Sequence, residues 1–135
     1  MARKNYRDLE AWKVSIEMVE CVYHLTKVFP AEERYGLMSQ MLRAAVSVPS
    51  NIAEGSGRTN RKEFLAFLSI ARGSLRELET QLTITVRLKF ISRDLALPLW
   101  DLCQRIGQML PRLMQSLRRD SGSQNVQRPT PNGSL

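Results

Sequence analysis

The chain has 135 residues, a formal net charge of +7 and 43% hydrophobic residues. No stretch approaches the roughly 18 consecutive apolar residues of a membrane span, and no apolar run of the kind found in signal peptides follows the basic opening residues. We therefore expect a cytoplasmic protein without a membrane partner, in which Cys21 and Cys103 are reduced core thiols rather than a disulfide.

Helix-ending signals divide the chain into four predicted helices with short connections. The first ends at Phe29-Pro30, because proline disfavours helical backbone in the residue that precedes it. The second ends at Gly55-Ser56-Gly57, and the third begins with Asn60 as N-cap and Glu63 three residues later. The four predicted helices cover about residues 6–28, 32–54, 60–90 and 93–119.

This pattern of elements determines the expected fold class. Four amphipathic helices with short connections favour an all-α protein, an antiparallel (up-down-up-down) four-helix bundle. We assign residues 1–119 to this one domain. Residues 120–135 are rich in serine, asparagine, glycine and proline and have almost nothing apolar to bury, so this C-terminal tail is predicted to be disordered.

Two of the predicted helices carry apolar residues on more than one side. In the first helix, one stripe runs through Trp12 and Ile16 and a second lies opposite; in the third helix, a weaker stripe lies opposite the main one. A helix of a monomeric bundle needs only one apolar face, so the second stripes favour contacts between subunits. The alternative is a single broad stripe in a tight bundle. The predicted oligomer interface consists of Val14, Met18, Leu25, Ile70, Ile84 and Leu88.

The inventory of reactive side chains indicates no catalytic site. His24 is the only histidine and follows Glu20 by one turn, which is typical of an exposed helical pair. No second histidine exists, and neither cysteine has a partner at metal-ligand spacing. Both cysteines lie on apolar stripes, away from a base that could activate them. We therefore expect no enzyme activity, no metal site and no cofactor.

Positive charge is concentrated in the middle of the chain. Residues 1–57 contain seven lysines and arginines and seven acidic residues, whereas residues 58–93 contain eight basic residues and three acidic ones. A local basic excess favours a polyanionic partner such as RNA. The alternative is a solvated helix face with no such partner.

Two parts of this basic region are candidate phosphate contacts. Around the glycines at 55 and 57, exposed backbone amides, the start of the third helix and three basic side chains could together hold a phosphate, although the spacing is not that of a P-loop. A capping turn with solvated charges is the alternative. Along the third helix, Arg72, Arg76, Thr83 and Arg87 share a face that could follow a nucleic-acid backbone.

These patterns give a set of predicted site residues. No aromatic residue interleaves the basic face of the third helix, which argues against a platform for stacking bases. Arg72 could instead turn inward and pair with Glu54 or Glu79, and of these we predict that Glu54 and Arg72 form a buried polar pair. The predicted nucleic-acid contacts are Arg58, Arg61, Lys62, Arg76 and Arg87.

Five segments, in this order, carry a family resemblance: Tyr6–Lys13, Phe29–Leu37 with Gln40, Ser47–Arg58, Glu63–Leu65 and Ile70–Glu79. Over about residues 6–92 the chain resembles the four-helix-bundle family of the 23S rRNA intervening-sequence proteins. The resemblance implies a bundle that assembles as a homopentameric ring, and relatives encoded within rRNA insertions. It also implies distant kinship to the accessory protein of diversity-generating retroelements, which works with a reverse transcriptase and RNA. The family has no established enzymatic activity.

The function predicted from residues and resemblance together is that of a non-catalytic homopentamer that binds RNA or another nucleic acid through residues 58–93. The alternative is an oligomeric scaffold that recruits a protein partner, such as a reverse transcriptase, without direct affinity for nucleic acid.

Overall fold

The computed structural model describes residues 5–122, which form four long α-helices and two single-turn 3₁₀ helices. No strand occurs in this described range, so the predicted all-α class is confirmed. In chain order the elements are η1 (Tyr6–Asp8), α1 (Glu10–Thr26), η2 (Ala31–Glu33), α2 (Leu37–Ser56), α3 (Arg61–Arg87) and α4 (Arg93–Gly122).

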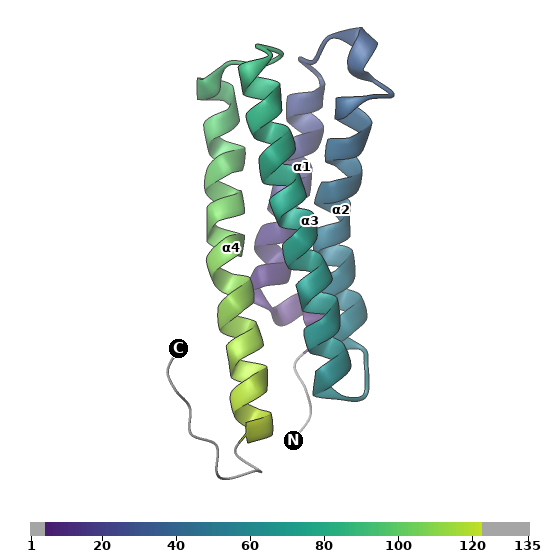
Figure 1. Ribbon diagram of the computed structural model, residues 1–135, viewed down its shortest axis with the longest axis vertical. Helices are drawn as coiled ribbons and strands as arrows, with labels where there is room; N and C mark the ends of the chain where they lie inside the picture. The colour runs from purple at the N-terminus through teal and green to yellow at the C-terminus, as the bar shows by residue number, and fades with distance from the viewer. Residues whose placement is uncertain (1–4, 123–135) are drawn as a thin grey trace.

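The four long helices lie side by side around a common hydrophobic core (Figure 1). Both α1 and α3 pack against α2 and α4. The ends of α1 and α3 lie at the same end of the molecule as the starts of α2 and α4 (Figure 1). No described helix is long and apolar enough to cross a membrane.

Several helix boundaries differ from the predicted ones. The first α-helix begins at Glu10 rather than Tyr6, because Leu9 is extended (φ −75°, ψ 128°) and separates it from η1. The second begins at Leu37, after η2 and a turn at Gly36. The predicted cap of α3 is confirmed, since the Glu63 N–H donates to Asn60 Oδ1 at 2.8 Å. The last helix continues to Gly122, past the predicted boundary at 119/120; the remainder of the predicted tail, residues 123–135, lies outside the described residues.

Lys89 sets the end of α3 three residues before the predicted position. Its backbone is left-handed (φ 64°). The Lys89 N–H donates to the Val86 carbonyl at 3.0 Å, and the Phe90 N–H donates to the Thr85 carbonyl at 3.0 Å. This is the Schellman pattern, in which glycine is the usual left-handed residue. Because a lysine rather than a glycine occupies this position, the sequence carries no glycine signal for the end of the helix.

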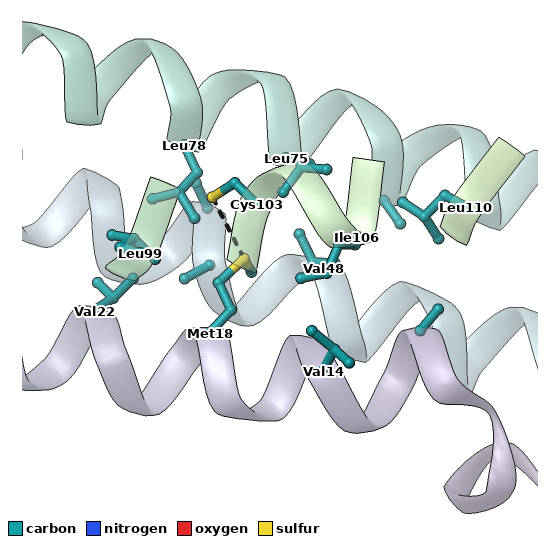
Figure 2. Packing of buried hydrophobic residues seen from close by; sticks show 14 of the residues in the cluster. Val14, Met18, Val22, Val48, Leu75, Leu78, Leu99, Cys103, Ile106 and Leu110 are labelled. Atoms are coloured by element: carbon teal, nitrogen blue, oxygen red, sulfur yellow. Dashed lines mark hydrogen bonds between the residues drawn. The ribbon is translucent and has the colours of Figure 1, made fainter. Parts of the chain in front are cut away.

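The core includes residues that we predicted to lie at a subunit interface. Val14, Met18 and Leu25 of α1 are 1%, 0% and 7% exposed, and Figure 2 shows Val14 and Met18 pointing toward residues of the other helices. Their assignment to an oligomer interface is therefore wrong. Both stripes of α1 are apolar, and periodicity alone does not tell which one faces inward. The stripe through Trp12 and Ile16 is the half-buried one.

Polar and steric details fit α2 closely to α3. The hydroxyl oxygens of Ser47 and Ser74 lie 2.7 Å apart across the two helices. The Asn51 amide donates to the Ser47 carbonyl at 2.8 Å and contacts the Ser47 hydroxyl at 2.9 Å. Lower along the same helix pair, Gly55 faces Phe64 and Phe67 at a distance that leaves no room for a side chain. This packing fixes the position of α3, which carries most of the candidate site.

Candidate nucleic-acid interface

Charge is divided unevenly between the two halves of the described chain. Residues 5–56, which include α1 and α2, contain five lysines and arginines and seven acidic residues. Residues 57–119, which include α3 and most of α4, contain twelve basic residues and five acidic ones. The excess positive charge of the described chain therefore lies on α3 and α4, which pack directly against each other.

The backbone amides of the glycine-containing turn between α2 and α3 are engaged in hydrogen bonds to carbonyls at the end of α2. The Gly57 N–H donates to the carbonyls of Ala53 and Glu54 at 3.3 and 3.2 Å, and the Arg58 N–H donates to the Gly55 carbonyl at 3.0 Å. These bonds complete the end of α2. The geometry therefore favours the alternative that the sequence left open here, a helix-capping turn, over a phosphate cradle.

Glu54 and Arg72 do not form the predicted buried pair. Both residues are exposed. Glu54 Oε2 lies 2.7 Å from the Arg58 guanidinium instead, and that guanidinium also lies 4.8 Å from the centre of the Phe67 ring. The reason is helical spacing: Arg58 follows Glu54 by four residues, which brings their side chains together. Arg58, a predicted phosphate contact, is thus engaged within the chain.

The outer face of α3 carries a row of exposed cations. Lys62, Arg72, Arg76 and Arg87 are all exposed, and Arg61 is half-buried. The Arg76 guanidinium lies 3.2 Å from the largely buried carboxylate of Glu79, which holds it along the helix. Within the part of the chain that the structure describes, Lys62, Arg72 and Arg87 form no ion pair, so their charges are available to a partner.

A groove of about 360 Å³ lies between the end of α3 and the start of α4. These two helix ends lie at the top of Figure 1. Trp100 and Arg93 of α4 line it together with Arg87 of α3. Trp100 is 37% exposed. The full lining is Leu82, Thr83, Val86, Arg87, Arg93, Ala96, Leu97 and Trp100.

Trp100 is the residue of this site that the sequence reasoning missed. The expectation that no aromatic residue is available for stacking concerns only the basic face of the third helix, and Trp100 comes from the next helix. A signal was present, because Arg93, Leu97 and Trp100 are spaced by four and three residues and so share one side of a helix. Only the packing of α4 on α3 shows that this side meets Arg87.

Three of the predicted interface residues lie on a different flank of α3. Ile70, Ile84 and Leu88 are 51%, 41% and 57% exposed. Ile70, Glu77 and Ile84 recur at seven-residue intervals, which places them on one side. That side lies nearer α2, since Glu77 lines a surface hollow with Gln40, Arg43, Ala44, Ser47 and Ser74. The apolar flank is therefore separate from the groove beside α4.

The cysteines have the environment of structural thiols. Burial raises the pKa of Cys103 to about 12, with smaller effects from the charges of Glu79 and Cys21. Burial also raises the pKa of Cys21. A thiol with a raised pKa is a weak nucleophile at neutral pH. Among the described residues, no group of three or more histidine, cysteine, aspartate or glutamate side chains could hold a metal ion.

Comparison with known proteins places this fold in a family. The structure is similar to the crystal structure of a protein of unknown function from the S23 ribosomal protein family of Bacteroides thetaiotaomicron VPI-5482, with a TM-score of 0.72 and 23% sequence identity. The match covers 77% of this chain and 97% of that one, and at this identity it concerns the fold. No curated protein matches the chain. The model of the 23S rRNA-intervening sequence proteins matches residues 7–112, which extends the resemblance into α4. The chain therefore belongs to the family of 23S rRNA-intervening sequence proteins.

Proposed function

We propose that this protein is a non-catalytic, cytoplasmic RNA-binding protein, in which up-down-up-down four-helix bundles assemble as a homopentameric ring. The single observation that carries the RNA-binding proposal is the row of exposed cations on α3, of which Lys62, Arg72 and Arg87 form no ion pair with another described residue and Arg76, paired with Glu79, lies between them. At about 1.5 Å per residue, this row is roughly 38 Å long, enough to follow several consecutive phosphates.

The position of the basic row relative to the apolar flank supports assembly through that flank, whereas the number of five subunits is taken from the family resemblance. Ile70 and Ile84 are exposed on the side of α3 nearer α2. If subunits meet there, the basic row and the groove beside α4 stay open to solvent. A ring would then present several copies of the basic row, and linked sites bind a long polyanion more tightly than one site does.

A salt titration tests RNA binding with matched variants. The test variant is Lys62→Gln/Arg72→Gln/Arg87→Gln, and the control variant Lys13→Gln/Lys27→Gln/Arg34→Gln removes the same charge from the side of α1 and η2. Fluorescence anisotropy with a labelled RNA hairpin measures Kd between 50 and 300 mM salt.

We expect the wild-type log Kd to rise steeply with log salt, and the test variant to lose about two to three from that slope, since each phosphate contact contributes about 0.7–0.9. The control variant should keep nearly the wild-type slope. Equal effects of the two variants would contradict the proposal, because the attraction would then depend on net charge alone.

A second candidate function is a scaffold that recruits a protein partner, such as a reverse transcriptase, without affinity for RNA. Exposed apolar side chains near the starts of α2 and α4 favour it, among them Tyr35 (89%) and Leu95 (51%). In the same titration, a pure scaffold would bind RNA only at low salt and show no binding at 150 mM.

A further inference from the structure

The groove between α3 and α4 combines an apolar interior with two arginines at one end, where the two helices are connected. Leu82, Val86 and Ala96 give it an apolar floor and walls, and Trp100 contributes an aromatic ring. Arg87 is the last residue of α3, and Arg93 is the first residue of α4. A ligand that fits such a site has a flat apolar part with anionic groups beside it.

We infer that this groove binds one unpaired RNA base, stacked on Trp100, with the phosphates on either side contacting Arg87 and Arg93. This inference rests on the proposed RNA-binding function and names the kind of RNA involved. A nucleotide is the unit of RNA that joins a planar base to phosphate groups. Stacking on an aromatic side chain is tolerant of base identity and adds to affinity without base-specific hydrogen bonds.

The aromatic ring and the small volume of the groove favour binding of one unpaired base over binding of a duplex. In a duplex, both faces of each base are covered by its neighbours, so only bases in loops, bulges and ends can stack on protein side chains. A volume of about 360 Å³ lies near the lower limit for sites that enclose small molecules, which suits one base rather than a stacked run.

The charges around the groove favour phosphate. The two charged residues of the lining, Arg87 and Arg93, are both basic, and Lys89 lies outside the lining, in the connection between them. At the start of α4, the Leu95 N–H donates to Ser92 Oγ at 3.1 Å, which caps this end of the helix. Two acidic residues, Asp94 and Glu79, lie near the groove in the sequence or on the same helices. Asp94 is exposed in the first turn of α4, and Glu79 is already bonded to Arg76 and to the Gln104 amide at 3.4 Å.

Because the basic row of α3 ends at Arg87, the groove continues that row onto α4. An RNA hairpin could place its paired stem along Lys62, Arg72 and Arg76 and its loop at Trp100. The row would then supply affinity for any RNA, and the groove would supply preference for RNA with an unpaired segment.

The experiment compares two labelled RNAs with equal numbers of phosphates, a hairpin with an unpaired loop and a fully paired duplex. Anisotropy gives Kd for wild type, Trp100→Ala and Trp100→Phe. We expect wild type to bind the hairpin about tenfold or more tightly than the duplex. Trp100→Ala should remove that preference and leave duplex binding unchanged, whereas Trp100→Phe should keep most of it because a ring is retained.

A direct readout uses tryptophan fluorescence in a Trp12→Phe background, in which Trp100 is the remaining tryptophan. The hairpin should quench this emission at saturation, and the duplex should not. Circular dichroism and sedimentation of each variant establish that fold and assembly are unchanged.

The outcomes separate this inference from the proposed function. If wild type binds neither RNA, the proposed function fails and the inference fails with it. If wild type binds both RNAs equally and Trp100→Ala changes nothing, RNA binding stands and the groove inference is overturned. If Trp100→Ala alters the sedimentation coefficient instead of the hairpin preference, the groove is a contact between copies of the chain, and the inference is also overturned.

Discussion

Gly55 of α2 faces Phe67 of α3 so closely that a Cβ atom on residue 55 would lie 2.7 Å from Phe67 Cβ and 2.9 Å from Phe64 Cδ1. Real Cβ atoms essentially never approach other atoms this closely. The glycine therefore sets the spacing of α2 and α3 at their lower end, beside the Glu54–Arg58 ion pair and the start of the basic row.

Replacing Gly55 by alanine should destabilise the protein. The new methyl group must displace two phenylalanines, and overpacking of this kind costs about 1–3 kcal/mol, more than the roughly 1 kcal/mol that alanine gains as a helix former. Gly73→Ala is the matched control, because a Cβ at this exposed position of α3 meets nothing within 4 Å. It should stabilise by about 0.5–1 kcal/mol. Urea unfolding measures the free energy of unfolding of both variants. If both variants were stabilised, or both destabilised, the proposed role of Gly55 in packing would be contradicted.

The same residues show how far sequence reasoning reaches. The start of α3 was predictable because the cap is local: Asn60 and Glu63 satisfy each other within one turn. Gly55 was interpreted as a helix terminator, yet α2 continues through it to Ser56. Its role in packing depends on Phe67, which comes from another helix and is invisible to local rules.

The candidate site likewise has one part that local sequence rules predict and another that depends on tertiary packing. The basic row of α3 was largely predictable, because helical periodicity alone places Arg72, Arg76 and Arg87 on one face. The ion-pair partner of each charged residue was not predictable. Glu54 pairs with Arg58 rather than with Arg72, because a spacing of four residues brings the side chains of Glu54 and Arg58 together. The contribution of Trp100 depends on which side of α4 meets α3, a tertiary fact.

Replacing Lys89 by glycine should stabilise the folded protein. A left-handed backbone costs an L-residue about 1–2 kcal/mol, and glycine adopts it freely. With φ at 64°, Lys89→Gly should raise the free energy of unfolding by about 1 kcal/mol. The control Lys89→Ala removes the charge but keeps the Cβ, so thermal unfolding should show little change. Equal stabilisation by both variants would show that charge, not backbone conformation, is responsible.

Cys103 should make stability fall at alkaline pH. Burial holds its pKa near 12, above the ordinary value of 9.0, so between these values the unfolded chain releases a proton that the folded protein keeps. Stability contributed by this thiol is therefore complete below pH 9 and declines above it, by about 1.4 kcal/mol per pH unit.

Urea unfolding of wild type and Cys103→Ala at pH 8, 9 and 10 isolates this effect, since all other titrating groups are shared. The variant should be less stable at pH 8, because it leaves a cavity beside Met18, whose sulfur lies 3.9 Å from Cys103 Sγ (Figure 2). The difference between the two proteins should narrow by about 1 kcal/mol from pH 9 to pH 10. A constant difference would mean that the thiol titrates normally in the folded protein.

The exposed isoleucines of α3 provide the test of assembly. Ile70→Glu/Ile84→Glu places two charges on the apolar flank, and a charge buried without a partner at a subunit contact is strongly unfavourable. If the chain forms a ring through this flank, sedimentation should show the variant as a monomer of 15.5 kDa. The control Ser69→Glu/Thr83→Glu has the same spacing one residue earlier, on the basic face, and should leave the mass unchanged. A wild-type monomer would contradict the ring, and an unchanged mass for the isoleucine variant would place the contact elsewhere on the surface.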